Sequence, residues 1–276
     1  LEDQLIVLES TTYPRTLKDV IAPLINRTRY KVGKNIYLAF SPERINPGSR
    51  QKIASIPKII GADDTKSLNM AKKIYSKVFD RVICTNDSSY AEAAKLTENI
   101  FRSVNIALVN ELKIIYDKMG IDIWEVIKLA KTKPFGYMPF YPGPGLGGHC
   151  IPIDPLYLSW QAKNFGLETK FINLSAKINS NMPKYIVDKS LKKFKHFYPS
   201  VLIKNLKVLI FGVAYKKDVN DLRESPALEI MKILRKKNIN FDFYDKYIPR
   251  IDDMRHYPEF KGMSSVKLSN KSIKKY

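Results

Sequence analysis

A continuous helical stripe in the middle of the chain constrains its fold more than any other feature. Apolar residues recur at helical spacing for about thirty residues, and the run ends at Gly120. Its members are Ala91, Ala94, Leu96, Ile100, Val104, Ala107, Leu108, Leu112, Ile115 and Met119. The pattern predicts one long helix with more apolar surface than a small domain needs, so we expect a subunit interface along it.

Short apolar runs alternate with helical stretches on both sides of this helix. Before it, the pattern predicts strands at 5–8, 36–40, 58–60 and 82–84, and a helix at 65–79. After it come a helix at 121–130, a Pro- and Gly-rich stretch at 132–153 and a helical block reaching about residue 194. The pattern then resets, with strands at 206–211 and 241–244 around a helix at 226–236. This alternation predicts an α/β layer with a mostly parallel sheet, followed by the start of a second βαβ unit.

Both α/β units are expected to be truncated. The run Leu5–Leu8 already has the character of a buried strand close to the first residue. At the other end, the chain reaches Tyr276 before enough strands exist to complete a second sheet.

The net charge of +20 allows two interpretations. Clustered lysines and arginines would bind nucleic acid. The lysines are spread along the chain at polar positions of amphipathic segments, however, which favours a solvated surface and an anionic small substrate. The absence of a long apolar run excludes a membrane span in this sequence. We therefore expect neither nucleic acid nor a membrane as a partner.

Only two cysteines, Cys84 and Cys150, occur in 276 residues. Such a low content argues against a disulfide framework and favours the cytoplasm. Neither cysteine stands at a metal-ligand spacing from the three histidines, so no metal site is predicted.

Cys150 stands in a glycine-rich loop just before a predicted helix. Gly147 and Gly148 precede it, Pro152 falls where a first helical turn would begin, and Asp154 follows at i+4. A thiolate beside a helix amino terminus is stabilised by the N–H groups there. The context predicts a reactive thiol, with a buried cysteine in a glycine turn as the alternative.

Lys95 and Asn99 lie four residues apart on the predicted long helix, and therefore on one face of it. An ammonium group beside an amide could hold a developing oxyanion. The alternative is that both are surface residues of an amphipathic helix.

Polar residues also follow the predicted strands. Thr11 follows the strand at 5–8, and Glu43 follows the strand at 36–40, where ligands of open α/β sheets bind. Lys216 and Arg223 lie in a charged loop running into a helix, which suits either a phosphate group or a solvated turn. No G-x-G-x-x-G fingerprint follows a strand in this sequence.

These features occur together and in order in one family. The chain resembles the UDP-glucose/GDP-mannose dehydrogenase family over nearly its whole length. The most specific segment is 133–155, supported by the co-linear motifs at 9–14, 40–44, 94–99 and 223–226. It is most similar to the branch that oxidises UDP-N-acetylglucosamine, with UDP-N-acetylmannosamine as the close rival. Pro47 stands where UDP-glucose dehydrogenases usually carry a second glutamate, which disfavours UDP-glucose.

The resemblance implies two Rossmann-like domains joined by a long central helix that forms a homodimer. It assigns 1–87 to the carboxyl-terminal part of an NAD-binding domain and 88–195 to a central helical dimerisation domain with the cysteine loop. It assigns 196–276 to the start of a UDP-sugar-binding domain. The glycine fingerprint of the family is expected before Leu1, and its final strands and helix after Tyr276. A truncated, inactive remnant is the alternative to an active enzyme.

The resemblance also implies a mechanism. NAD+ takes a hydride from C6 of the sugar, Cys150 attacks the resulting aldehyde, and a second NAD+ oxidises the thiohemiacetal to a thioester that water hydrolyses to the uronate. Lys95 and Asn99 would steady the oxygen on C6, and Asp154 would hold a water or share a proton with Lys95.

The remaining site residues are implied in the same way. Glu43 would act as acid or base in thioester hydrolysis, and Thr11 would orient the water or contact the cofactor, with Glu43 and Cys150 also facing that cofactor. The loop over the nucleotide sugar would comprise Phe140, Tyr141 and 143–147, including Gly143 and Gly147. Lys216 and Arg223 would face the UDP.

Overall fold

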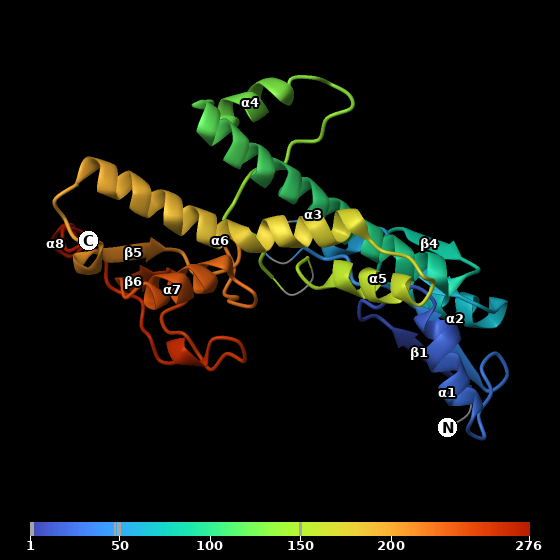
Figure 1. Cartoon of the computed structure of the whole chain (residues 1–276). Coiled ribbons are helices and arrows are strands. Elements are labelled where there is room, and N and C mark those ends of the chain that lie inside the picture. Colours follow the sequence, from blue (N-terminus) through green and yellow to red (C-terminus); the bar gives the residue numbers. More distant parts are fainter. Residues whose placement is uncertain (1–2, 47, 49–50, 149–150) are drawn as a thin grey trace. The chain divides into compact units, whose positions relative to one another are not determined.

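The computed structural model describes residues 3–46, 48, 51–148 and 151–276 (Figure 1). Two compact units divide the chain. Unit 1 comprises Leu1–Phe101 and Ile153–Lys170, and unit 2 comprises Arg102–Pro152 and Phe171–Tyr276.

Unit 1 contains a four-stranded sheet in the order β1-β2-β3-β4. The strands are β1 (Gln4–Leu8), β2 (Ile36–Phe40), β3 (Lys58–Ala62) and β4 (Val82–Thr85), which confirms all four predicted strands. The pairs β1–β2 and β3–β4 are parallel, whereas β2–β3 is antiparallel. Among the described residues of the link between β2 and β3, the one regular element is the 3-10 turn η2 (Ile53–Ser55), whereas a parallel crossover usually runs through a helix.

Helices cover the sheet of unit 1. α2 (Thr65–Tyr75) begins at Asp64, whose side chain accepts a hydrogen bond from the Ser67 N–H, and it buries Leu68 and Ala71. It ends at Tyr75 and not at residue 79 as predicted. A helical stretch that the sequence analysis missed, η1 (Leu17–Ile21) continuing into α1 (Ala22–Asn26), follows β1.

The predicted long helix is α3 (Ser88–Met119). Gly120, with φ of 72°, ends it, and the Ile121 N–H returns to the Tyr116 carbonyl at 2.9 Å. α4 (Ile123–Ala130) then begins two residues after its predicted start, with Asp122 as its N-cap. The single helical block predicted after residue 153 is two helices, α5 (Asp154–Lys163) and α6 (Lys170–Phe197), separated by a turn at Gly166.

Unit 2 contains the second βαβ arrangement. After the short turn η3 (Ile203–Asn205), β5 (Lys207–Phe211) pairs in parallel with β6 (Asn240–Tyr244), and α7 (Pro226–Lys236) connects them. Leu228 and Met231 of α7 are fully buried with Phe243 of β6 in the core of this unit. The short helices η4 (Pro258–Phe260) and α8 (Asn270–Ile273) follow.

Asp117 joins α3 to α6 inside unit 2. Its carboxylate binds Lys113 at 2.5 Å, the Tyr185 hydroxyl at 2.5 Å, and Lys189. Although burial acts against it, these hydrogen bonds lower the pKa of Asp117 to about 2, and the carboxylate helps raise the pKa of Tyr185, already raised by burial, to about 12.

We expect Asp117→Asn to lower the free energy of unfolding by about 1 kcal/mol at pH 7, because solvent screens part of this network. The folded pKa of Asp117 lies below its ordinary value of 3.8, so its contribution is present above that value and disappears as the pH falls through about 2. Urea unfolding at pH 7 and pH 3 measures the difference. Asp188→Asn, at an exposed carboxylate paired with Lys237, is the control, and an equal loss in both variants would contradict the prediction.

Candidate functional site

Three polar side chains of α3 and α5 are buried within unit 1. Lys95 is 8% exposed, Asn99 is 3% exposed and Asp154 is 4% exposed. The Asn99 Nδ2 donates to Asp154 Oδ2 at 2.6 Å, across 55 positions of sequence. The interpretation of Lys95 and Asn99 as surface residues is therefore wrong. We call these three residues the α3–α5 polar cluster.

Lys95 is unusual within this cluster. Among the residues that the structure describes, no hydrogen bond or ion pair joins its ammonium group to a partner. The side chain as a whole is buried, so the ammonium group stands at the end of a stem that is enclosed by the protein. Asn99 is one partner of Asp154, and the role of Asp154 in holding a water or sharing a proton with Lys95 stays a prediction.

The carboxyl ends of β1 and β2 lie at one edge of the sheet of unit 1. Leu8 and Phe40 are paired in register, so the segments that carry Thr11 and Glu43 leave the sheet side by side. Thr11 is half-buried, while Glu43 is exposed and accepts the Ile45 N–H at 2.6 Å. This edge is where ligands of open α/β sheets bind.

Several contacts fix the backbone around Glu43. The Ser41 N–H donates to the Leu8 carbonyl at 3.0 Å, and the Ser41 hydroxyl to the Ile59 carbonyl at 2.8 Å. Arg44 pairs with Glu98 of α3 at 2.6 Å. Glu43 therefore projects from an anchored loop.

A buried lysine lies behind that loop. Lys58 donates to Glu9 at 3.2 Å and to the Pro42 carbonyl at 3.4 Å. Although burial opposes it, hydrogen bonds from Tyr75 and Lys58 lower the pKa of Glu9.

The glycine-rich loop in unit 2 packs closely against the loop after β5. A Cβ on Gly147 would lie 2.7 Å from the Cβ of Tyr215, and one on Gly148 would lie 2.7 Å from the Tyr215 ring. Gly148 also has φ of 85° and donates its N–H to the Arg223 carbonyl at 3.0 Å. Only glycine permits this approach.

The predicted sugar-loop residues take different positions within unit 2. The Gly143 N–H donates to the Asn110 side chain of α3 at 2.9 Å. Tyr141 is exposed and stacks on Trp124 of α4, with ring centroids 6.0 Å apart. Phe140 is half-buried.

Lys216 lines a cleft of about 440 Å³ at the carboxyl ends of β5 and β6. Lys217, Lys246, Tyr244 and Tyr247 line the same cleft. Burial, with the positive charge of Arg102 adding to it, lowers the pKa of Lys216. Arg223 is exposed, and its guanidinium binds Asp221 at 2.6 Å.

Cys150, His149 and Pro47 lie outside the described residues. The other cysteine, Cys84, is half-buried on β4, and burial raises the pKa of its thiol. In the described part of the chain, no group of three or more His, Cys, Asp and Glu side chains could hold a metal ion. Within that same part, no helix has the length and apolar character needed to cross a bilayer.

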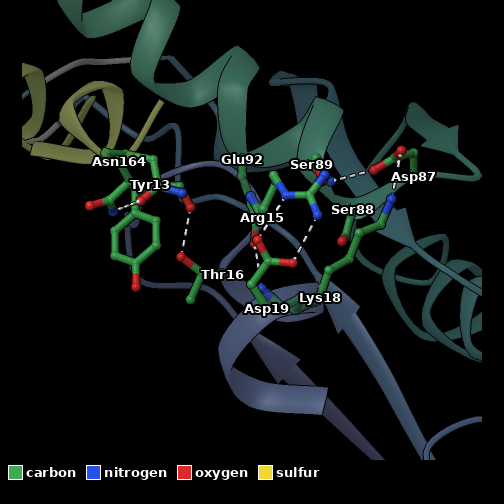
Figure 2. Close-up of polar contacts among 12 residues, drawn as sticks. Tyr13, Arg15, Thr16, Lys18, Asp19, Asp87, Ser88, Ser89, Glu92 and Asn164 are labelled. Carbon is green, nitrogen blue, oxygen red and sulfur yellow. Dashed lines mark hydrogen bonds and ion pairs between the residues drawn. The ribbon is translucent and has the colours of Figure 1, made fainter. Parts of the chain in front are cut away.

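The sequence analysis missed Glu92, a fully buried carboxylate of α3 that binds the segment after β1 (Figure 2). A signal for it exists in the sequence. Polar residues recur at helical spacing inside the apolar stripe, at Glu92, Lys95, Asn99 and Ser103, and all four are buried.

Three family models match successive parts of the chain. Three models of the UDP-glucose/GDP-mannose dehydrogenase family match the chain: the NAD binding domain at residues 1–79, the central domain at 89–181 and the UDP binding domain at 209–276. The chain belongs to the UDP-glucose/GDP-mannose dehydrogenase family, as the motifs indicated.

Individual relatives have more specific names. A UDP-N-acetyl-D-mannosamine dehydrogenase of Methanococcus aeolicus is 39% identical over 89% of this chain and 53% of its own length. A UDP-N-acetyl-D-glucosamine 6-dehydrogenase of Pseudomonas aeruginosa is 32% identical over 92% of this chain and 60% of its own. The chain thus spans little more than half the length of these relatives.

A solved structure supports the fold. The UDP-D-ManNAc dehydrogenase of Pyrococcus horikoshii superposes with a TM-score of 0.80 at 33% identity, covering 88% of this chain and 57% of that one. The predicted fold class, α/β with Rossmann-like domains, is confirmed.

Proposed function

We propose that the protein oxidises the C6 alcohol of a UDP-N-acetylhexosamine to the uronate, with NAD+ as hydride acceptor. The α3–α5 polar cluster is the observation that carries the proposal. Its three residues are buried, the Asn99 amide binds Asp154, and Lys95 precedes Asn99 by four residues on α3; Asp154 in turn follows the proposed nucleophile Cys150 at i+4 in the sequence. Donors fixed before the reaction stabilise a developing oxyanion without reorganising.

The proposed substrate is an N-acetylated UDP-sugar because of the relatives that the chain resembles. The N-acetylmannosamine enzyme is 39% identical and the N-acetylglucosamine enzyme 32% identical. These values favour UDP-N-acetylmannosamine over UDP-N-acetylglucosamine, the reverse of the preference that the motifs gave.

NAD+, when bound, supplies the hydride acceptor. The carboxyl edge of β1 and β2 fits the nicotinamide half of such a cofactor, with Thr11 and Glu43 to face it together with Cys150. This sequence contains no glycine fingerprint for the pyrophosphate, so we assign no residue to that group.

Each side chain of the proposed site then has its own role in the reaction. Lys95 and Asn99 hold the C6 oxygen as its charge develops, and Asp154 keeps the Asn99 amide oriented. The Cys150 thiolate adds to the C6 aldehyde carbon to give a thiohemiacetal, whose C6 hydride would go to a second NAD+ and whose hydroxyl proton would go to water, which leaves a thioester between the two. Thr11 orients a water, and Glu43 takes its proton as it attacks the thioester, releasing uronate and the thiolate.

In unit 2, we assign Phe140, Tyr141, Gly143 and Gly147 to the loop over the nucleotide sugar, and Lys216 and Arg223 to the UDP. The match of residues 209–276 to the UDP binding domain supports this assignment. The three family matches also support the division at 1–87, 88–195 and 196–276.

We further propose a homodimer through the central helix. Large apolar side chains remain exposed on the distal half of α3 and on α4, a pattern typical of a subunit interface. They are Leu108, Ile115, Met119, Trp124 and Leu129.

A substrate panel tests the proposed function. The protein is incubated with NAD+ and UDP-N-acetylmannosamine, UDP-N-acetylglucosamine or UDP-glucose, and NADH and uronate are quantified. We expect about two NADH per sugar and a kcat/KM for an N-acetylated sugar at least about tenfold above that for UDP-glucose. An absence of NADH with all three sugars would favour the inactive remnant.

A further inference from the structure

Glu92 is a fully buried carboxylate to which the proposed chemistry assigns no role. Its two oxygens accept the backbone N–H groups of Arg15 at 2.5 Å and Leu17 at 3.0 Å. Figure 2 shows Glu92 beside Arg15. Burial raises the pKa of Glu92, against the hydrogen bonds from these N–H groups. A carboxylate is buried at a cost unless its oxygens are satisfied, so the two bonds tie α3 firmly to the segment after β1.

The position of Glu92 on α3 links this contact to the proposed site. Glu92, Lys95 and Asn99 stand at i, i+3 and i+7, and all three are buried on one face of the helix. The helix face that would hold the C6 oxygen therefore also binds, through Glu92, the segment that contains Thr11.

Residues 11–17, here called the Thr11 segment, are linked by hydrogen bonds among themselves and to Glu92. The Thr12 and Thr16 hydroxyls lie 2.6 Å apart, and Thr16 donates to the Tyr13 carbonyl at 2.6 Å. Arg15 has φ of 76°, a conformation that an L-residue adopts only when its surroundings compensate. Two N–H groups pinned by Glu92 on either side of Thr16 provide that compensation.

The same segment also contacts the second helix of the cluster. The Tyr13 ring packs on Trp160 of α5, with centroids 5.0 Å apart. The helices that contribute Asn99 and Asp154 thus both contact the Thr11 segment, and both contacts lie within unit 1.

We propose that Glu92 is a positioning residue, which holds the Thr11 segment so that Thr11 is set relative to Lys95 and Asn99 for thioester hydrolysis. The inference rests on the proposed function. A simple structural anchor would instead affect the amount of folded protein and nothing else.

Glu92→Gln keeps the size of the side chain but replaces one acceptor oxygen by an NH2 group facing an N–H donor. We expect the amide of Arg15 or Leu17 to exchange with solvent at least about tenfold faster, because it loses a buried acceptor. We expect the first-turnover burst of about two NADH per site to persist while the steady-state rate falls about tenfold, because only hydrolysis depends on the oriented water.

Glu111→Gln, at an exposed glutamate of the same helix, is the matched control and should change neither quantity. Thr16→Val is the second variant: it removes the hydroxyl that contacts Thr12 and Tyr13 but keeps the backbone N–H groups that face Glu92, and it should give the same kinetic pattern.

Two results would overturn the inference: unchanged exchange of both amides in Glu92→Gln, or a burst and a steady-state rate that fall by the same factor. Failure of the proposed function is a separate result, in which the unaltered protein makes no NADH. The exchange of the two amides then decides by itself whether Glu92 holds the segment.

Discussion

Replacing Lys95 by methionine is expected to lower kcat by about 10²- to 10³-fold while leaving the fold as stable as before, or more so. The loss follows from removing a positive charge aimed at a developing oxyanion, whose removal typically costs that much. The free energy of unfolding should rise, because methionine has a similar length and fills the same buried position without a charge to desolvate. A gain of about 1 kcal/mol in the free energy of unfolding is expected.

Activity and stability of Lys95→Met are expected to change in opposite directions, and each is measured separately. Steady-state NADH formation gives kcat, and urea unfolding gives stability. Lys118→Met is the control, because Lys118 is an exposed lysine in the last turn of the same helix. A Lys95→Met variant that loses stability and retains full activity would show that Lys95 is structural.

The strands could be predicted because each is a short run with one dominant signal. β2 consists of Ile36–Phe40, all buried, and no polar residue interrupts it. The helix after β1 also had a usable signal, since Leu17, Ile21, Leu24 and Ile25 recur at helical spacing and Pro23 falls in the first turn of α1, where proline is tolerated. The antiparallel β3 was similarly foreseeable, because no crossover helix is encoded between Phe40 and Lys58.

The site was harder to predict from sequence, because its contacts cross large separations. Spacing alone correctly placed Lys95 and Asn99 on one face, but it could not reveal that this face is buried. The bond from Asn99 to Asp154 depends on how α5 returns to α3, which no local pattern specifies. The tight packing of Gly147 on Tyr215 is of the same kind.

Cys150→Ser is expected to abolish uronate release, with a loss of at least about 10³-fold, the largest effect proposed for this chain. A serine hydroxyl is almost wholly protonated at neutral pH, whereas a thiol near a helix amino terminus is readily ionised. Without the thiolate adduct, the aldehyde lacks the covalent route to a thioester, so NADH per sugar should fall from about two to one or fewer. Counting NADH and uronate per mole of UDP-sugar measures both.

Cys84→Ser is the matched control, since Cys84 is the only other cysteine of the sequence. Burial raises the pKa of its thiol, so it is a weak nucleophile near neutral pH, and its replacement should leave the NADH count at about two. A thiol-alkylating reagent extends the test: it should inactivate the unaltered protein and Cys84→Ser at similar rates, with UDP-sugar protecting both. Uronate formation by Cys150→Ser at the unaltered rate would exclude a covalent intermediate on this cysteine and leave the α3–α5 polar cluster to act on the alcohol and its hydrated aldehyde directly.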